Sequence, residues 1–411
     1  MQIHLKVYYL TILLFSFGNC LSAQVDRPLT IGKIETIHSK ILNENRDFWI
    51  HLPDNGASGK NYPVLYLLDG GSHFYSVVGM MRQLSAMNGN TVCPQMIVVG
   101  IPNTNRTRDL TPTRARAGQL FVDSTLIANS GGGEEFIAFL EKELMPYVEA
   151  NYPTEPYRMF IGHSLGGLTV MHALVHHPNL FQSYVAIDPA MNWDEEFLLK
   201  KIKAGALGTH YPNKALYLAI ANTMEPDMDT SRVWLDTTFA TAHIRSILAL
   251  DHHLKEQAGS NIRYRGKYYG DDDHTSVPLI AEYDAFRFIF ASYQFRISYE
   301  DYIDPESDMY ERVIDHYRRL SAEWGYRIRP QEDFVNNLGH AFLNLDQFAV
   351  AGQLFQLNVE NYPTSFRVYD SLGDYYRTLG DKENAITNYR RALSLNENAS
   401  SAAKLEKLLK K

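Results

Sequence analysis

The sequence predicts an α/β domain with a mostly parallel sheet and helices on both faces, followed by a small all-α region. Up to about residue 296, short β-branched apolar runs alternate with longer stretches of helical apolar spacing. Most of the short runs are continuously apolar, as strands covered on both faces are. Such alternation favours parallel strands joined by helices. After residue 296 the spacing becomes helical throughout.

The predicted strands and helices alternate along the first part of the chain. Strands are expected at Phe48–Pro53, Pro63–Gly70, Gln95–Ile101, Arg158–Gly162, Ser183–Pro189, Ala215–Asn222 and Asn261–Gly270. Helices are expected at Gly133–Ala150, Leu165–His177, Leu235–Gln257 and Val277–Phe295. An amphipathic helix at Tyr310–Tyr326 then joins the two regions, which gives boundaries at 24–296, 297–330 and 331–411.

Two similar units make up most of the last region. Leu338-Gly339, Phe342, Ala351 and Phe355 in the first unit match Leu372-Gly373, Tyr376, Ala385 and Tyr389 in the second, at a shift of 34 residues. This is the period of tetratricopeptide helix pairs, whose small residues let aromatic rings pack between helices. Two units are too few for a free solenoid, so we expect a helical cap docked on the main domain, in preference to an independent protein-binding array.

Composition excludes several classes of protein. The net charge is −8 and there is no long basic run, which gives no case for nucleic-acid binding. The N-terminal segment aside, Cys93 is the one cysteine, so no intrachain disulfide is expected and Cys93 itself is predicted to be buried and inert. No histidine–cysteine metal framework is present in the sequence. We therefore expect neither a metal nor an organic cofactor.

Residues 1–23 resemble a secretory signal peptide. Lys6 precedes the apolar run Val7–Gly18, and the small residue Ala23 offers a cleavage site. The run is too short for a comfortable membrane span. Cys20 raises the alternative of a lipoprotein, but the residues before it fit a lipidation site poorly. We expect a soluble protein exported to the periplasm or beyond.

The segment GHSLG, residues 162–166, matches the pattern G-x-S-x-G. A strand is predicted before it and a helix after it, which is the context of a nucleophilic serine on a strained turn. Gly162 and Gly166 would clear the space that such a turn needs. Ser164 would then lie at a helix N-terminus, where unpaired N–H groups stabilise negative charge. The sequence predicts Ser164 as a nucleophile.

A serine nucleophile needs a base, and the base needs an orienting acid. In sheets with this turn the order along the chain is serine, acid, histidine. His274 lies in the polar loop GDDDHTSVP, directly after the last predicted strand, and is the expected base. Several other histidines after Ser164 lie on predicted helices: His172, His176, His177, His252 and His253.

The acid has three candidates. Glu225 comes first in the loop after the strand Ala215–Asn222 and is preferred. Asp227 in the same loop is the second candidate, and Asp188, after the preceding strand, is the third. The oxyanion hole needs two backbone N–H groups. One is expected from Leu165, and the second from the segment at Gly70 and Gly71.

Four segments resemble a known family. They read YPVLYLLDGG, IVVGIPNTNRTRDLTPT, FIGHSLGGLTVMHAL and DPAMNW. Together they resemble the "putative esterase" family of α/β-hydrolases, which includes enterochelin, salmochelin, feruloyl and acetylxylan esterases, S-formylglutathione hydrolase and mycolyltransferases. The resemblance covers about residues 30 to 295 and is closest to bacterial members with a C-terminal helical extension.

The resemblance implies an α/β-hydrolase fold with the same nucleophile, base and oxyanion donors. It favours Glu225 as the acid, although many relatives have serine where this chain has Asp188, and some siderophore esterases are thought to work with serine and histidine alone. It also places Asn105–Thr113 near the mouth of the site. Arg106 and Arg108 could there bind an acidic or catechol-rich substrate, or could instead brace the loop; Trp193 is a further candidate for substrate binding.

These observations predict an exported serine esterase that needs no cofactor. The ester could belong to a siderophore, an acylated carbohydrate or a small acyl compound. The alternatives are an acyltransferase that uses the same acyl-enzyme, and an inactive hydrolase-like scaffold that binds a protein through its C-terminal helices.

Overall fold

The computed structural model describes residues 29–53, 60–87, 91–116, 124–207, 211, 213–257, 262–304, 306–397 and 399–410. Residues 32–411 form one compact unit, which carries every feature discussed below. The predicted signal peptide with Ala23 and Cys20 lies outside the described residues. No helix within those residues combines the length and apolar character that a bilayer crossing requires.

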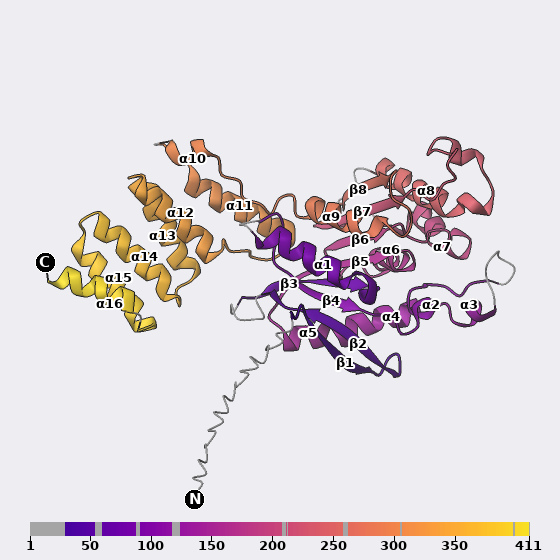
Figure 1. The fold of residues 1–411 in the computed structure, drawn as a ribbon, viewed down its shortest axis with the longest axis horizontal. Coiled ribbons are helices and arrows are strands. Elements are labelled where there is room, and N and C mark those ends of the chain that lie inside the picture. The colour runs from indigo at the N-terminus through magenta and orange to yellow at the C-terminus, as the bar shows by residue number, and fades with distance from the viewer. Residues whose placement is uncertain are drawn as a thin grey trace, which may run out of the picture. The chain divides into compact units, whose positions relative to one another are not determined.

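Eight strands form one sheet, in the spatial order β1-β2-β4-β3-β5-β6-β7-β8 (Figure 1). The pairs β1–β2 and β2–β4 are antiparallel, and the remaining pairs are parallel. The strands are β1 (Lys33–Ser39), β2 (Glu44–His51), β3 (Tyr62–Leu68), β4 (Ile97–Ile101), β5 (Thr154–His163), β6 (Ser183–Ile187), β7 (Lys214–Ala221) and β8 (Ile262–Tyr269). The mostly parallel sheet is confirmed.

The first strand is the one that the sequence analysis missed. β1, with the sequence KIETIHS, lies at the edge of the sheet, and most of its side chains are exposed or half-buried. An edge strand of this kind lacks the apolar run that marks a central strand such as β3, in which every residue is buried. The seven predicted strands are all present.

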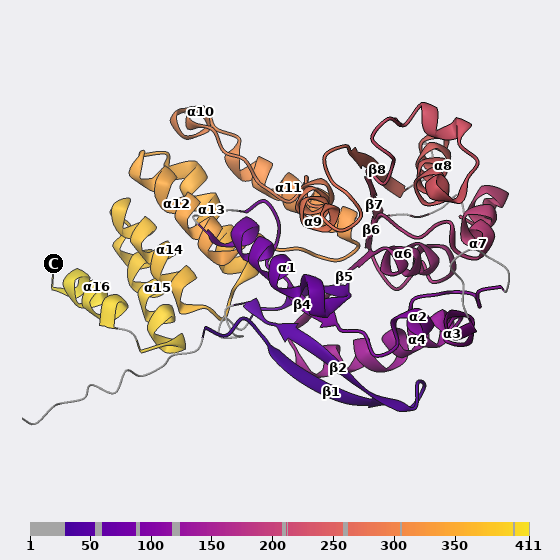
Figure 2. The same ribbon diagram turned by 45° about the vertical axis from the view of Figure 1, so that its right-hand side comes forward.

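Helices cover both faces of the sheet (Figure 2). On one face α1 (Gly70–Ser85) packs against α9 (Val277–Ile289), and the other face carries α4 (Gly133–Phe139), α6 (Leu165–His176) and α8 (Ala242–Glu256). The shorter elements here are α2 (Arg106–Asp109), α3 (Ser124–Ala128), α5 (Met145–Asn151) and α7 (Trp193–Lys201), with π-helical turns at Leu140–Leu144 and Ile202–Ala206 and 3₁₀ turns at Arg232–Leu235 and Phe239–Thr241.

Four helices differ from the sequence prediction. α1 was not predicted, because Gly70-Gly71 reads as a turn, yet Phe74, Val77 and Met81 form its buried face. The helix predicted at Gly133–Ala150 contains a π-helical turn just before Pro146, whose missing N–H interrupts the α-helical pattern. α8 begins at Ala242 rather than at residue 235, and α9 ends at Ile289.

The C-terminal region is helical throughout. After the short α10 (Tyr299–Ile303) come α11 (Met309–Trp324), α12 (Glu332–Asn344), α13 (Phe348–Asn361), α14 (Phe366–Thr378), α15 (Lys382–Leu395) and α16 (Ala399–Leu409). A Cβ on Gly339 would lie 2.9 Å from the ring of Phe355, and one on Gly373 would lie 2.6 Å from that of Tyr389. The repeated glycines therefore let an aromatic ring of the next helix approach, as the tetratricopeptide pattern predicts.

α11 packs against the sheet at the end where β6 and β7 begin. The ring centroid of Trp324 lies 4.4 Å from that of Tyr157 and 5.8 Å from that of Phe290. Arg263 on β8 binds Glu323 on α11, with 3.0 Å between Nη2 and Oε1. Because residues 32–411 form one compact unit, the domain boundaries predicted at 296 and 330 stay predictions.

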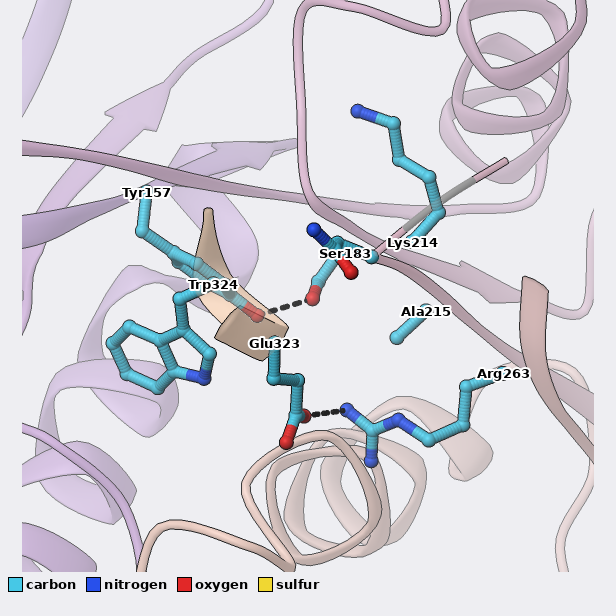
Figure 3. Close-up of a pocket in the computed structure, with 8 residues that line it drawn as sticks. Tyr157, Ser183, Lys214, Ala215, Arg263, Glu323 and Trp324 are labelled. Carbon is cyan, nitrogen blue, oxygen red and sulfur yellow. Dashed lines mark hydrogen bonds and ion pairs between the residues drawn. The ribbon is translucent and has the colours of Figure 1, made fainter. Parts of the chain in front are cut away.

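A pocket of about 200 Å³ lies at this contact (Figure 3). Its walls include Tyr157, whose hydroxyl is hydrogen-bonded to that of Ser183, and the Arg263–Glu323 ion pair. Ser183 is the first residue of β6 and Lys214 the first of β7. The pocket therefore lies where the parallel strands begin, whereas Ser164 follows the end of β5 and lies where they end.

The buried Trp324 should contribute strongly to stability. We expect Trp324→Ala to lower the free energy of unfolding by about 3–5 kcal/mol, because it leaves a cavity between α11 and the sheet. Trp324 is 5% exposed, whereas Trp234 is 49% exposed. Trp234→Ala is therefore the matched control, and thermal unfolding followed by circular dichroism compares the two. Equal melting temperatures for both variants would contradict the packing described.

Candidate active site

Ser164 occupies a strained turn between β5 and α6. Its backbone has φ 58° and ψ −117°, a region that costs about 1–3 kcal/mol for a residue with a side chain. Its N–H donates to Ile187 O at 2.9 Å, and its carbonyl accepts from the N–H groups of Leu168 and Ala190 at 3.0 Å each. These bonds hold the strained residue between the ends of two neighbouring strands. The strand and helix predicted around Ser164 are both present.

The glycines of the motif are explained by close backbone approach. A Cβ on Gly162 would lie 2.4 Å from the carbonyl carbon and oxygen of Gly166, which no rearrangement of a side chain could relieve. The position of a Cβ on Gly166 lies 3.3 Å from Asp69 Oδ2 and 3.4 Å from Leu68 Cβ. The start of α6 thus packs directly against the end of β3.

Asp188 follows β6 and is completely buried. Its Oδ1 accepts the Ala221 N–H at 2.9 Å. Its Oδ2 accepts hydrogen bonds from two imidazoles, His274 Nδ1 at 2.6 Å and His243 Nε2 at 2.8 Å. Burial alone would raise the pKa of Asp188, but the hydrogen bonds from His243 and His274 hold this pKa well below its ordinary value. The carboxylate is therefore ionised near neutral pH.

His274 lies in the loop between β8 and α9, as predicted, and reaches the serine turn. Its ring centroid is 4.5 Å from that of His163, the residue before Ser164. Because Asp188 takes Nδ1, Nε2 is the nitrogen left for another partner. Within the described residues no hydrogen bond joins the Ser164 hydroxyl to His274, and the pairing of these two groups stays a prediction.

The structure brings Asp188 to His274, whereas the sequence analysis preferred Glu225. Glu225 and Asp227 both lie exposed on the loop after β7. This loop folds on itself, with the Glu225 carbonyl accepting the Met228 N–H at 2.9 Å. β6 lies between β5 and β7 in the sheet, so its end is the nearer to Ser164. The order along the chain could not reveal this difference in distance.

The predicted oxyanion donors begin two helices. Leu165 is the first residue of α6 and Gly70 the first of α1. A helix leaves its first N–H groups without partners inside the helix, so both helix starts offer donors beside the serine turn. A Cβ on Gly70 would lie 2.6 Å from Ile101 N, which explains the glycine, while Gly71 has open space around it. Their action on a substrate oxygen stays a prediction.

The three predicted substrate contacts all have partners within the protein. Arg106 binds Asp69 through Nε–Oδ1 at 2.7 Å and Nη2–Oδ2 at 3.0 Å, and Nη2 also donates to His163 O at 3.2 Å. Arg108 binds Glu44 and Asp109, with its shortest distance 2.6 Å between Nη2 and Glu44 Oε1. Trp193 Nε1 donates to Thr113 O at 3.1 Å. Each residue therefore braces a loop, and contact with substrate stays a prediction.

The sequence analysis did not identify the residues around His274. His243 lies on α8, 55 positions from Asp188, and no local pattern marks it. His163 is largely buried, its Nε2 has no hydrogen-bond partner, and burial lowers its pKa to about 4. Its ring centroid lies 6.0 Å from that of His73, whose Nδ1 is 3.6 Å from Oε1 of the buried Glu282.

Two groups of described residues have the types and spacing of metal ligands. They are Asp188, His243 and His274, and Glu134, His172 and His177, with the ligand atoms of each group within 4.8 Å of one another. In the second group Glu134 accepts from His172 Nε2 at 2.7 Å and from His177 Nε2 at 3.0 Å. In both groups the carboxylate already pairs with both imidazoles. Cys93 is buried, as predicted, and burial raises its pKa to about 12.

Glu282 should make stability depend on pH. Burial raises the pKa of its carboxyl from 4.5 to about 8, so between these values the unfolded chain loses a proton that the native state keeps. Stability should therefore fall as pH rises from 5 to 8, by up to about 1.4 kcal/mol per pH unit. Glu282→Gln removes this pH dependence. The melting temperature of the variant relative to that of the wild type should therefore rise as the pH increases from 5 to 8. The exposed Glu225→Gln is the control, and parallel curves for all three proteins would refute the prediction.

Comparisons with known proteins agree with this fold. The "Putative esterase" family model matches residues 39–248, just over half of the chain, and a tetratricopeptide model matches residues 366–398. Ferri-bacillibactin esterase BesA of Bacillus subtilis (strain 168) is 35% identical over 183 residues, which are 42% of this chain and 63% of that protein. Siderophore triacetylfusarinine C esterase of Aspergillus fumigatus is 27% identical over 164 residues, 38% of this chain and 53% of the relative. The chain thus spans somewhat over half the length of these curated relatives.

Solved structures extend the likeness beyond the sheet. An IroE-like serine hydrolase from Shewanella oneidensis is 29% identical with a TM-score of 0.65, over 80% of this chain and 99% of that one. An uncharacterised protein from Capnocytophaga ochracea shares the fold over 92% of this chain and 100% of its own, with 18% identity and a TM-score of 0.62. The serine turn, the sheet order and the family match lead to one conclusion: the chain belongs to the "Putative esterase" family.

Proposed function

We propose that this chain is a serine hydrolase that cleaves a carboxylic ester, with Ser164 as nucleophile, His274 as base and Asp188 as the orienting acid. The observation that carries the proposal is the 2.6 Å contact between His274 Nδ1 and the buried Oδ2 of Asp188, beside the serine turn. An imidazole held through Nδ1 presents Nε2 as the proton acceptor, which is its role in serine hydrolysis. Asp188 takes the place of Glu225 in this proposal.

The reaction proceeds through an acyl-enzyme. His274 Nε2 takes the Ser164 proton as Oγ attacks the ester carbonyl, and the N–H groups of Leu165 and the Gly70–Gly71 segment bind the resulting oxyanion. His274 then gives its proton to the alkoxide oxygen, and the alcohol leaves. Water, activated by the same imidazole, hydrolyses the acyl-enzyme and frees Ser164. The ionised Asp188 stabilises the imidazolium that forms in both steps.

We infer that the ester belongs to a siderophore, in preference to an acylated carbohydrate or a small acyl ester. The names of the relatives support this choice: they are esterases of ferri-bacillibactin, triacetylfusarinine C, enterobactin and apo-salmochelin. We infer further that the chain is exported, because residues 1–23 have the charge and apolar pattern of a signal peptide. Removal of that segment would leave Gln24 as the first residue.

The roles of the three residues can be separated with a short activated ester. Ser164→Ala should abolish hydrolysis, and Asp188→Ala should lower kcat by about 10³-fold or more, because the imidazole loses its orientation and charge partner. Glu225→Ala, which changes the exposed acid, should behave as the wild type. Initial rates with p-nitrophenyl acetate measure all three variants. Undiminished activity in Ser164→Ala, or a larger loss in Glu225→Ala than in Asp188→Ala, would overturn the assignment.

The substrate class needs a panel. The purified enzyme should show its highest kcat/KM with a catecholate or hydroxamate siderophore ester, at least about tenfold above acetylated xylo-oligosaccharides and p-nitrophenyl acetate, since contacts to the whole substrate add transition-state binding. Chromatography of the products follows the siderophores, with Ser164→Ala as the blank. A preference for the acetylated sugar would refute the siderophore inference and leave the serine mechanism intact.

A further inference from the structure

His243 is the second imidazole on the acid of the proposed site. It is the second residue of α8, whereas His274 comes from the loop after β8. Both rings donate to the same oxygen, Asp188 Oδ2, at 2.8 Å and 2.6 Å respectively. The two rings lie at 88° to each other with their centroids 5.2 Å apart. A carboxylate oxygen has two lone-pair directions, and each imidazole occupies one of them.

We propose that His243 is a positioning residue of the esterase site: its Nε2–H holds the Asp188 carboxylate so that Oδ2 stays aligned with His274 Nδ1. The proposal rests on the function proposed above and adds a fourth residue to it. His243 does not touch the reacting atoms. It acts through Asp188, whose own position then sets the orientation of His274.

The geometry around Asp188 explains why such help is needed. Asp188 follows the last residue of β6 with φ 40°, a conformation that is unfavourable for a residue with a side chain. One backbone donor, the Ala221 N–H, binds Oδ1. If His274 were the one donor on Oδ2, its movement during proton transfer would leave this buried oxygen unpaired, which is costly. His243 supplies a donor that stays in place throughout the reaction.

The second ring nitrogen of His243 also has a partner. Nδ1 lies 3.4 Å from the side-chain amide oxygen of Asn192, at the start of α7. This contact holds the ring on the side opposite Asp188. Asn192, His243, Asp188 and His274 then form one chain of hydrogen bonds that leads towards Ser164.

Docking of α8 alone does not account for a histidine at this position. The helix already buries Ile244, Ile247, Leu250 and Leu254 against the sheet, and these apolar residues suffice to anchor it. The His243 side chain is 22% exposed, and an apolar side chain of similar size would bury as much surface at this position. The specific feature of His243 is its donor, which points at the one carboxylate that binds His274.

The test compares a variant that keeps the donor with one that removes it. In His243→Gln the side-chain Nε2 can reach the position of the imidazole Nε2, whereas His243→Leu has no donor. We expect His243→Leu to lower kcat about 10- to 100-fold with KM nearly unchanged, the factor that loss of one hydrogen bond to a charged group represents. His243→Gln should recover most of that loss. His252→Leu, on the same helix and 74% exposed, is the matched control and should equal the wild type.

A double-mutant cycle identifies the path of the effect. If His243 acts through Asp188, His243→Leu should have little further effect in the Asp188→Ala background, so the two losses are not additive. Additive losses, a wild-type kcat in His243→Leu, or equal losses in the Leu and Gln variants at equal folded fractions would each overturn the inference while Ser164→Ala remains inactive. Activity that survives Ser164→Ala would instead refute the proposed function itself. Circular dichroism of each variant measures the folded fraction.

Discussion

A carboxylate with no access to water must find its hydrogen-bond donors inside the protein, and Asp188 finds three of them. One is a backbone N–H of the neighbouring strand β7, and two are imidazoles from α8 and from the loop after β8. Each of these elements must be in place before the charge can be buried without a large penalty. The need of the Asp188 carboxylate for buried donors is therefore met through the order of the strands, because that order brings the donors together. It also explains why the acid lies at the end of β6, the strand that adjoins both β5 and β7.

The ends of three adjoining strands share one backbone feature. Asp69 after β3, Ser164 after β5 and Asp188 after β6 all have positive φ, at 52°, 58° and 40°. Each such residue costs free energy that the surrounding contacts have to offset. Arg106 contributes to this by binding the Asp69 carboxylate at two atoms and the His163 carbonyl at a third. The loops at the ends of these strands are thus held by ion pairs and backbone hydrogen bonds, in conformations that a free chain would rarely adopt.

Sequence patterns revealed the parts of this structure that depend on local spacing. Most of the seven predicted strands have continuous apolar runs, and the serine motif lies between a strand and a helix as expected. β1 was not predicted because an edge strand needs no such run. α1 was not predicted because its first residues, Gly70 and Gly71, are typical of a turn. The acid and His243 depend on distances between elements far apart in the chain. Periodicity carries no information about those distances, so the order serine, acid, histidine left three acids open.

The contact of α11 with the sheet bears on where the chain can be cut. The sequence pattern changes near residue 296, and a fragment that ends there would lose Trp324. In the complete protein Trp324 packs against the rings of Tyr157 and Phe290, which the fragment would leave uncovered. Arg263 would lose Glu323 at the same time. The smallest soluble catalytic fragment should accordingly extend through Trp324, and fusions or truncations designed from family boundaries alone would expose an apolar surface that invites aggregation.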